Sequence, residues 1–583
     1  MTKPCSHSSN MLLRGESSAS DQCMTTERVE ESEAATSRST RGVSSRKLLF
    51  DVAICLALAT LAFFLATYRW ISTGALWPDS PRYANAAGMV HDWLKAGEWN
   101  RPLEFAKNNY AQYPAFNVPY HPPAYPGLLG VTFVIFGESY STARYFIGIC
   151  LTIAALLYYG LMRRLDNDRT AAFFSALLLL LTPDVVRWSR DTMSEVPALA
   201  ILLAASWLFL QWLQTERAFY CILAFIVVGI AFFCRVTVIG VLPGWALFAL
   251  LSKGGRFTRS RVFLLSGSSL LVVVVSWVSF VGRFSKYEVV SDGRTQGFGY
   301  RNIAYFIECF PVILLWGPVL AGLVGLAVWC GRKGVGRNGL FWVCWLLSVC
   351  IFKLVMLTSL EPRHFFMGIP AFVGLAAFLL DRNNVYWVRR GLAPIVVLFA
   401  ATLGVAQIVH LPQGVVGYQD VASKLAAGDR PGNVFMTCWH DQDLIFRYRA
   451  CDPVHRRQMI RGDRTLSVRL AEYAGVPPTI QARTSQDVLD LIHRCRARYI
   501  VTTSPKEGRV DHRVEEMKLA HQTICSQPDR FILLGRFDLL IQFDRPGRRE
   551  DVYLWQYDGE FPEGPSRVPV VIPTAGIQVE FNN

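Results

Sequence analysis

The first apolar run of the chain, residues 48–70, reads LLFDVAICLALATLAFFLATYRW. An α-helix needs roughly 20 mostly apolar residues to cross the hydrocarbon core of a bilayer, and this run is long enough. Residues 1–47 are rich in Ser, Thr, Glu and Arg and contain no apolar run. This composition predicts a disordered tail, and the late start of the apolar segment argues against a signal peptide.

Similar runs continue to Leu411, and the whole chain is 52% hydrophobic and only 18% charged. Soluble globular proteins carry about 25% charged residues. The composition therefore excludes a disordered protein, a disulfide miniprotein and an ordinary cytosolic enzyme. The segment 218–252 is open to two interpretations, two short spans or one long bent span. Counted as two, it gives a polytopic α-helical membrane protein of eleven spans: 48–70, 145–162, 170–186, 196–213, 218–234, 236–252, 262–281, 311–330, 339–357, 365–380 and 391–411.

The apolar segment 121–137 is not counted, because its unbroken run covers about half a bilayer and three prolines precede it. We expect an interfacial helix there, within a long, structured outer loop formed by residues 71–144. With the N-terminus inside, the short inner loops have 14 Lys or Arg in 37 residues, against 13 in the 112 residues of the outer segments. This agrees with the positive-inside rule, and the net charge of +14 then reports topology rather than a nucleic-acid partner.

Residues 412–583 form the predicted extracytoplasmic α/β domain. Helices are expected at 420–427 and 485–496, and strands at 433–439, 498–504, 530–543 and 551–557. The domain holds Cys438, Cys451, Cys495 and Cys525. An oxidising compartment permits disulfides between them, and free buried thiols fit the sequence equally well.

Two acidic motifs flank the predicted membrane surface. In Trp77-Pro78-Asp79-Ser80-Pro81-Arg82-Tyr83, Pro81 suits the first turn of a helix, which makes Ser80 the expected N-cap. Asp79 is then available for chemistry, or it only favours the helix N-terminus through the dipole. In the segment 189–197, SRDTMSEVP, Glu195 stands at the membrane boundary, where an unpaired charge is costly. The alternative is a solvated loop with a capping acid.

Cations and aromatic residues complete the candidate site. Arg235 stands at the outer end of the fifth span, and Arg363-His364 opens the tenth. An arginine at this depth binds a lipid phosphate well, although a salt bridge to a loop acid explains Arg363 too. His121 and Tyr125 lie in a proline-rich entry to the interfacial helix. Acids and arginines on one outer face suit a reaction between a lipid phosphate and a polar acceptor, with a carboxylate taking the proton of a hydroxyl.

These motifs resemble the polyprenyl-phosphate-sugar-dependent glycosyltransferases of the GT-C superfamily, such as protein O-mannosyltransferases and lipid A aminoarabinose transferases. The resemblance covers roughly residues 48–411. Asp79 with Tyr83 and Ala84 matches the D-x-x-x-Y-A pattern after the first span, and His121-Pro122-Pro123 leads to a helix that ends in Phe-Gly. Ser189-Arg190 with Glu195 and Pro197 matches the next motif, and Arg363 the last, with His364 in place of the usual tyrosine.

The resemblance implies inverting transfer of a sugar from a polyprenyl-phosphate carrier to an acceptor hydroxyl. Asp79 would be the general base or orient the acceptor, and Glu195 would support it or help hold a divalent metal ion, a requirement in which relatives differ. Arg235 and Arg363 would neutralise the leaving phosphate. The remaining residues would line or support the site: His364, His121 and Tyr125 around the donor, with Arg190, Asp191 and Tyr83 behind.

Two other classes of function remain open. A transporter or flippase of a lipid-linked solute explains the spans and buried charges, but explains the acid-bearing outer loop less well, and no halves with matching broken helices are visible. A sensor or scaffold would not need eleven spans. The inner loops favour a bacterial inner membrane. The sugar, the acceptor (glycan, lipid or protein) and the role of the C-terminal domain are not readable from the sequence.

Overall fold

The structure is a computed structural model that describes most of residues 48–583. It leaves out the predicted tail and most of the last predicted span. Outside the described residues lie 1–47, 69–73, 117–120, 166, 255–259, 285–306, 309–315, 331–336, 356–361, 381–393, 396–397, 400–401, 404, 407–413, 453, 455–456, 469–478, 505–512, 543–546, 573–576 and 583. Residues 58–583 form one compact unit.

Long apolar helices dominate the first part of the chain. The protein is a multi-pass membrane protein. Among the described residues, five helices are long and apolar enough to cross a bilayer. They are Leu48–Thr67, α5 (Tyr140–Arg164), α8 (Glu195–Thr215), Val236–Lys253 (η2, Val236–Val241, with α10, Leu242–Lys253) and Arg261–Arg283 within α12 (Arg261–Phe284). The pair α6 (Arg169–Leu180) and α7 (Pro183–Ser189) is bent by 59° at the break between its helices, and counted as one span it gives a sixth.

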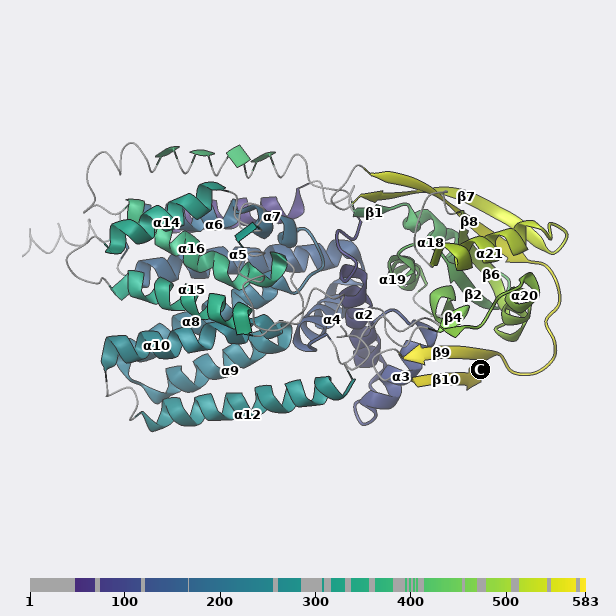
Figure 1. The fold of residues 1–583 in the computed structure, drawn as a ribbon, viewed down its shortest axis with the longest axis horizontal. Helices are drawn as coiled ribbons and strands as arrows, with labels where there is room; N and C mark the ends of the chain where they lie inside the picture. Colours follow the sequence, from purple (N-terminus) through teal and green to yellow (C-terminus); the bar gives the residue numbers. More distant parts are fainter. Residues whose placement is uncertain are drawn as a thin grey trace, which may run out of the picture. The chain divides into compact units, whose positions relative to one another are not determined.

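Four other predicted spans correspond to helices that are not among these. These are α9 (Ala218–Cys234), α14 (Trp316–Cys330), α15 (Arg337–Val355), and the run η4 (Pro362–Gly368), α16 (Ile369–Ala376) and η5 (Ala377–Leu380). The segment 218–252 is divided into two parts at Arg235, where α9 ends and η2 begins. In Figure 1, α8, α9 and α12 run side by side. The total of eleven spans stays a prediction.

The first outer loop is helical and carries α2 (Ser80–Ala96), α3 (Pro102–Gln112) and α4 (Ala124–Phe136). At 1.5 Å per residue, the 13 residues of α4 reach about 20 Å, which is too short for a bilayer. Pro81 lies in the first turn of α2, as expected, but the predicted N-cap is wrong by one residue. Asp79 occupies the N-cap position, and its carboxylate makes no capping hydrogen bond.

The C-terminal region is an α/β fold built on a six-stranded mixed sheet with the order β1-β7-β8-β6-β2-β3. The parallel part consists of β6, β2 and β3, while β8, β7 and β1 continue antiparallel. The strands are β1 (Gly414–Val416), β2 (Asn433–Thr437), β3 (Met459–Arg461), β6 (Ala497–Thr503), β7 (Phe531–Gln542) and β8 (Arg548–Tyr557). Two small pairs, β4 (Ser467–Val468) with β5 (Thr479–Ile480) and β9 (Arg567–Ile572) with β10 (Ile577–Asn582), complete the strands.

Helices cover both faces of this sheet (Figure 1). Because side chains alternate along a strand, Phe435 of β2 joins the core under α20 (Ser485–Arg494) and α21 (Arg513–Cys525), while Val434 and Met436 join the core under α18 (Tyr418–Ala427) and α19 (Asp441–Cys451). The four predicted strands and two predicted helices are confirmed. All four cysteines of this region are free thiols.

The outer loop packs into the same two cores. Tyr110 and Phe116 belong to the core under α20 and α21, and Tyr113 and Ala115 belong to the other. A backbone bridge between Ala75 and Val415 adds a second junction. This approach requires glycine at position 74, where a Cβ would stand 1.6 Å from the Val415 carbonyl oxygen. The loop and the C-terminal region are therefore packed as one body.

Candidate functional site

Asp191 ties together two loops of the helical part, both of which are predicted to lie on its outer side. Its Oδ1 accepts hydrogen bonds from the Leu76 backbone N–H at 3.2 Å, from Ser80 Oγ at 2.5 Å and from the Thr192 N–H at 2.9 Å. Burial raises the pKa of Asp191 to about 6, although these hydrogen bonds oppose the shift. Asp191 therefore fixes the turn that presents Asp79 against the motif that contains Glu195.

Asp79 lies between two arginines. Its Oδ2 is 2.8 Å from Arg363 Nη2 and its Oδ1 is 3.3 Å from Arg82 Nη1, and 17% of its side chain is exposed. Burial opposes ionisation, but Arg363 and Arg82 outweigh it and hold the pKa of Asp79 well below its usual range. Arg363 also lies over the ring of Trp77 at 5.3 Å. Asp79 is thus an ionised carboxylate in contact with a cation that another part of the chain supplies.

Glu195 forms the second ion pair. Its Oε1 is 2.7 Å from Arg235 Nη1, and the two side chains are 0% and 8% exposed. Arg235 also donates to Ser194 Oγ at 3.3 Å, and Ser194 donates to the Tyr83 hydroxyl oxygen at 3.3 Å. Glu195 Oε2 is buried without a hydrogen-bond partner among the described residues, as is Nε of Arg235. A buried polar atom without a partner is costly, so this pair has hydrogen-bonding capacity that a further polar group can satisfy.

Aromatic rings pack around Tyr83, which lies near both ion pairs. The ring of Tyr83 packs edge-on against His121 at 4.4 Å and Tyr125 at 5.2 Å between centroids. The Tyr125 hydroxyl is fully buried and has no hydrogen-bond partner in the described part of the chain. Burial lowers the pKa of His121 to about 4, despite the opposing effect of Asp79, so its imidazole is neutral at neutral pH.

Most of the residues singled out in the sequence therefore come together. Asp79, Tyr83, His121, Tyr125, Asp191, Glu195, Arg235 and Arg363 form this one group. Arg190 is buried with its guanidinium 5.8 Å from the ring of Tyr68. His364 follows Arg363 in η4 and is half-buried. The salt bridge weighed for Arg363 as an alternative is present, and its acid is Asp79.

Sequence reasoning missed the residues that brace this group. Arg82 was part of the quoted motif but received no role, and its Nε donates to Gln442 Oε1 at 3.1 Å. The Gln442 backbone oxygen accepts from Asn85 Nδ2 at 3.0 Å, so α19 of the C-terminal region contacts α2 directly. Arg144 donates to the Gly74 carbonyl at 2.8 Å. A contact over 360 positions leaves no local signal in one sequence, so no motif could have revealed Gln442.

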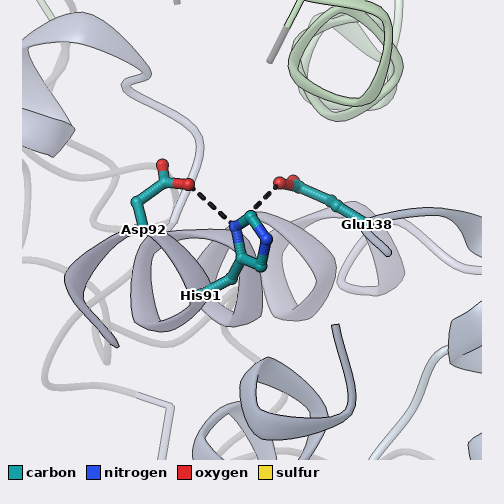
Figure 2. Close-up of side chains that lie close together, drawn as sticks. All are labelled: His91, Asp92 and Glu138. Carbon is teal, nitrogen blue, oxygen red and sulfur yellow. Dashed lines mark hydrogen bonds and ion pairs between the residues drawn. The ribbon is translucent and has the colours of Figure 1, made fainter. Parts of the chain in front are cut away.

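A second cluster lies at the other end of α2. Asp92 Oδ1 is 2.9 Å from His91 Nδ1, and Glu138 Oε2 is 3.7 Å from the same nitrogen (Figure 2). Within the described residues, these three side chains are the one group whose metal-type ligand atoms all lie within 4.8 Å. The residues around Asp79 do not form such a group, so we derive no step through a metal there.

Comparisons with known proteins were made with both sequence and structure. Residues 120–280 match the family model "Dolichyl-phosphate-mannose-protein mannosyltransferase". The undecaprenyl phosphate-α-4-amino-4-deoxy-L-arabinose arabinosyl transferase 2 of Proteus mirabilis is 26% identical over 359 residues, which are 58% of this chain and 60% of that protein. The putative mannosyltransferase YkcB of Bacillus subtilis is 25% identical over 160 residues, or 26% of this chain and 22% of YkcB.

Among solved structures, ArnT from Cupriavidus metallidurans is similar in fold. Its apo form matches with a TM-score of 0.54 at 15% identity, and its complex with undecaprenyl phosphate with 0.52 at 13%. Both matches cover 86% of this chain and 97% of ArnT.

The chain thus resembles membrane glycosyltransferases in sequence and ArnT in fold, and the resemblance drawn from the motifs is confirmed. The particular relatives are transferases named for mannose and for aminoarabinose. The sequence match spans less than two thirds of either curated relative, so the donor and acceptor of this chain are matters for proposal.

Proposed function

We propose that the chain transfers a sugar from a polyprenyl-phosphate carrier to an acceptor hydroxyl on the outer face of the membrane. The N-terminus is then cytoplasmic, and the C-terminal region lies outside a bacterial inner membrane. One observation carries the proposal, the ion pair at 2.8 Å between Asp79 of the first outer loop and Arg363 at the start of η4. It joins a carboxylate suited to proton transfer with a cation suited to a phosphate.

The two arginines bind and stabilise the leaving phosphate. Negative charge grows on the carrier phosphate as its bond to the sugar breaks, and preorganised cations at that position lower the barrier. Arg363 offers a planar fork of donors that suits phosphate oxygens. Arg235 is held by Glu195 and Ser194, so its orientation is fixed before the donor arrives.

Asp79 is the general base for the acceptor hydroxyl. Its pKa is held low as long as Arg363 faces it, and a carboxylate of very low pKa is a weak base. When a donor phosphate draws Arg363 toward itself, Asp79 loses part of that stabilisation and its basicity rises. Donor binding thereby prepares the base, and without donor the base is held weak.

Tyr83, His121 and Tyr125 form the wall beside the reacting centre. Their rings exclude water from the space between the ion pairs, which strengthens the electrostatic interactions there. The neutral imidazole of His121 and the unpartnered hydroxyl of Tyr125 can hydrogen-bond sugar hydroxyls without adding charge.

The test is to incubate the purified protein with polyprenyl-phosphate mannose and, separately, with polyprenyl-phosphate aminoarabinose. Release of free polyprenyl phosphate with sugar on an acceptor supports the proposal. Movement of the intact donor across a liposome membrane without bond cleavage would support the transporter instead. For variants of Asp79, the matched control is Glu104→Gln. Glu104 lies in the same loop as Asp79, is exposed, and pairs only with Arg101 among the ion pairs of the described residues.

A further inference from the structure

The open cavity at the far end of α2 from Asp79 has no part in the chemistry described so far. Its volume is about 600 Å³. Its walls come from α2, α3, the turn before α5, and α19 of the C-terminal region. We propose that this cavity binds a saccharide segment of the acceptor, so that the acceptor is a glycan chain. The proposal deepens the proposed function and rests on it for its role in transfer.

The floor of the cavity is rigid and charge-balanced. Arg449 is 0% exposed and pairs with Asp92 at 2.7 Å and Glu138 at 3.1 Å, and it also donates to Asn109 at 3.2 Å. The ring of Tyr113 lies 4.6 Å from its guanidinium. A bridging arginine already satisfies the carboxylates that a metal ion would need. A cation is therefore a poor fit here, although His91, Asp92 and Glu138 stand close together in Figure 2.

The lining suits a neutral ligand with many hydroxyls. Two acids, Asp92 and Glu138, are offset by two cations, Arg449 and Lys95 on the rim. Amides of Asn108 and Gln112 both donate and accept, as a sugar hydroxyl does. Phe105 adds an apolar face against which a pyranose ring can pack. The volume of the cavity lies within the range of small-molecule sites.

The position of the cavity sets the size of the acceptor. Asp92 follows Asp79 by 13 residues on α2, and a rise of 1.5 Å per residue separates them by about 20 Å. A saccharide unit bound in the cavity can present a hydroxyl to Asp79 only if further units bridge this distance. The arrangement selects a chain of several sugar units over a monosaccharide, and it gives the C-terminal region a role through Arg449 and Ala450.

The experiment measures binding of neutral linear oligosaccharides of two to eight hexose units to the full-length protein in detergent, by saturation-transfer NMR. The expected result is saturable binding to the wild type, with at least a tenfold loss of affinity in Asn108→Trp, which fills the cavity, and a weaker loss in Gln112→Ala. Asn108 is exposed, so the larger side chain needs no rearrangement of a core. Lys107→Trp places the same indole ring on α3 at an exposed residue that does not line the cavity, and should bind as the wild type does.

Binding that persists unchanged in Asn108→Trp would overturn the proposal. So would the absence of binding by any oligosaccharide, or displacement of bound saccharide by Zn²⁺ alone. Binding needs no chemistry, so an Asp79→Asn protein should still bind. If Asp79→Asn keeps wild-type transfer, the proposed function fails while the saccharide site is judged separately by these titrations.

Discussion

Both ends of α2 carry ion pairs between acids and arginines, but the two ends differ in how completely the polar atoms are bonded. At the N-terminal end, Asp79 faces Arg363 and Glu195 faces Arg235, and buried polar atoms nearby have no partner among the described residues. At the C-terminal end, one buried arginine bridges Asp92 and Glu138 and also bonds Asn109. The ion pairs of the first end have hydrogen-bonding capacity left for a ligand, while those of the second satisfy one another and form the floor of the cavity.

This difference separates a site that changes partners from one that holds a shape. A charge whose partner is exchangeable can transfer its interaction to a substrate. A buried charge with three partners loses far more when any of them leaves. Substitutions at the first end should therefore change rates, and those at the second should change stability.

Asp79→Asn should have the largest effect on rate. Asparagine keeps the shape but cannot accept a proton, and general-base catalysis is typically worth 10²–10⁴-fold. We expect transfer to fall by roughly that factor, measured as release of polyprenyl phosphate. Its thermal midpoint should stay near that of the wild type, with Glu104→Gln as the control. Transfer near the wild-type rate would remove Asp79 from the chemistry.

Arg449→Met should have the largest effect on stability. It leaves Asp92 and Glu138 as uncompensated buried charges, which typically costs about 3–5 kcal/mol. The measurement is the thermal midpoint in detergent. Arg536→Met is the matched control, because Arg536 is 61% exposed in its pair with Asp551 and such pairs are worth at most about 1 kcal/mol. Equal shifts in the two variants would contradict the contrast between the two ends.

Residues at the N-terminal end of α2 were singled out from the sequence, whereas none of the cluster at its C-terminal end was. Asp79, Glu195 and Arg363 stand in short motifs next to long apolar runs, so position relative to the membrane carried the signal. The cluster around Arg449 brings together residues more than 300 positions apart, and none stands in a motif. The α/β fold followed from strand and helix periodicity, whereas the packing of the outer loop into both cores depends on long-range contacts that periodicity does not encode.

Arg363→Met should alter both rate and pH dependence. Loss of a charge-assisted contact to the phosphate is worth roughly 1.5–3 kcal/mol, or about 10- to 150-fold in kcat/KM. Because Arg363 holds the pKa of Asp79 low, its removal raises that pKa toward the ordinary value near 4. The acid limb of kcat/KM, which reports the free enzyme, should then move to higher pH. Arg363→Lys keeps the charge and should leave the acid limb nearly in place. If the acid limb lies at the same pH in Arg363→Met and Arg363→Lys, Arg363 does not control the pKa of Asp79.

Gln442→Ala should have the smallest effect. It tests whether the residues at the two ends of α2 are coupled through α19. Gln442 lies in α19, the helix that also carries Arg449, and its side chain accepts from Arg82, which in turn contacts Asp79. Loss of one such hydrogen bond is worth about 0.5–1.5 kcal/mol, so we expect a few-fold to about tenfold fall in kcat. KM for the donor should not change, because Arg363 and Arg235 are untouched. Gln486→Ala, an exposed glutamine of the same region, should have no effect. A fall in thermal stability without a fall in kcat would mean that Gln442 only joins the two parts of the fold. A fall in kcat at unchanged thermal stability would make it a positioning residue for Asp79.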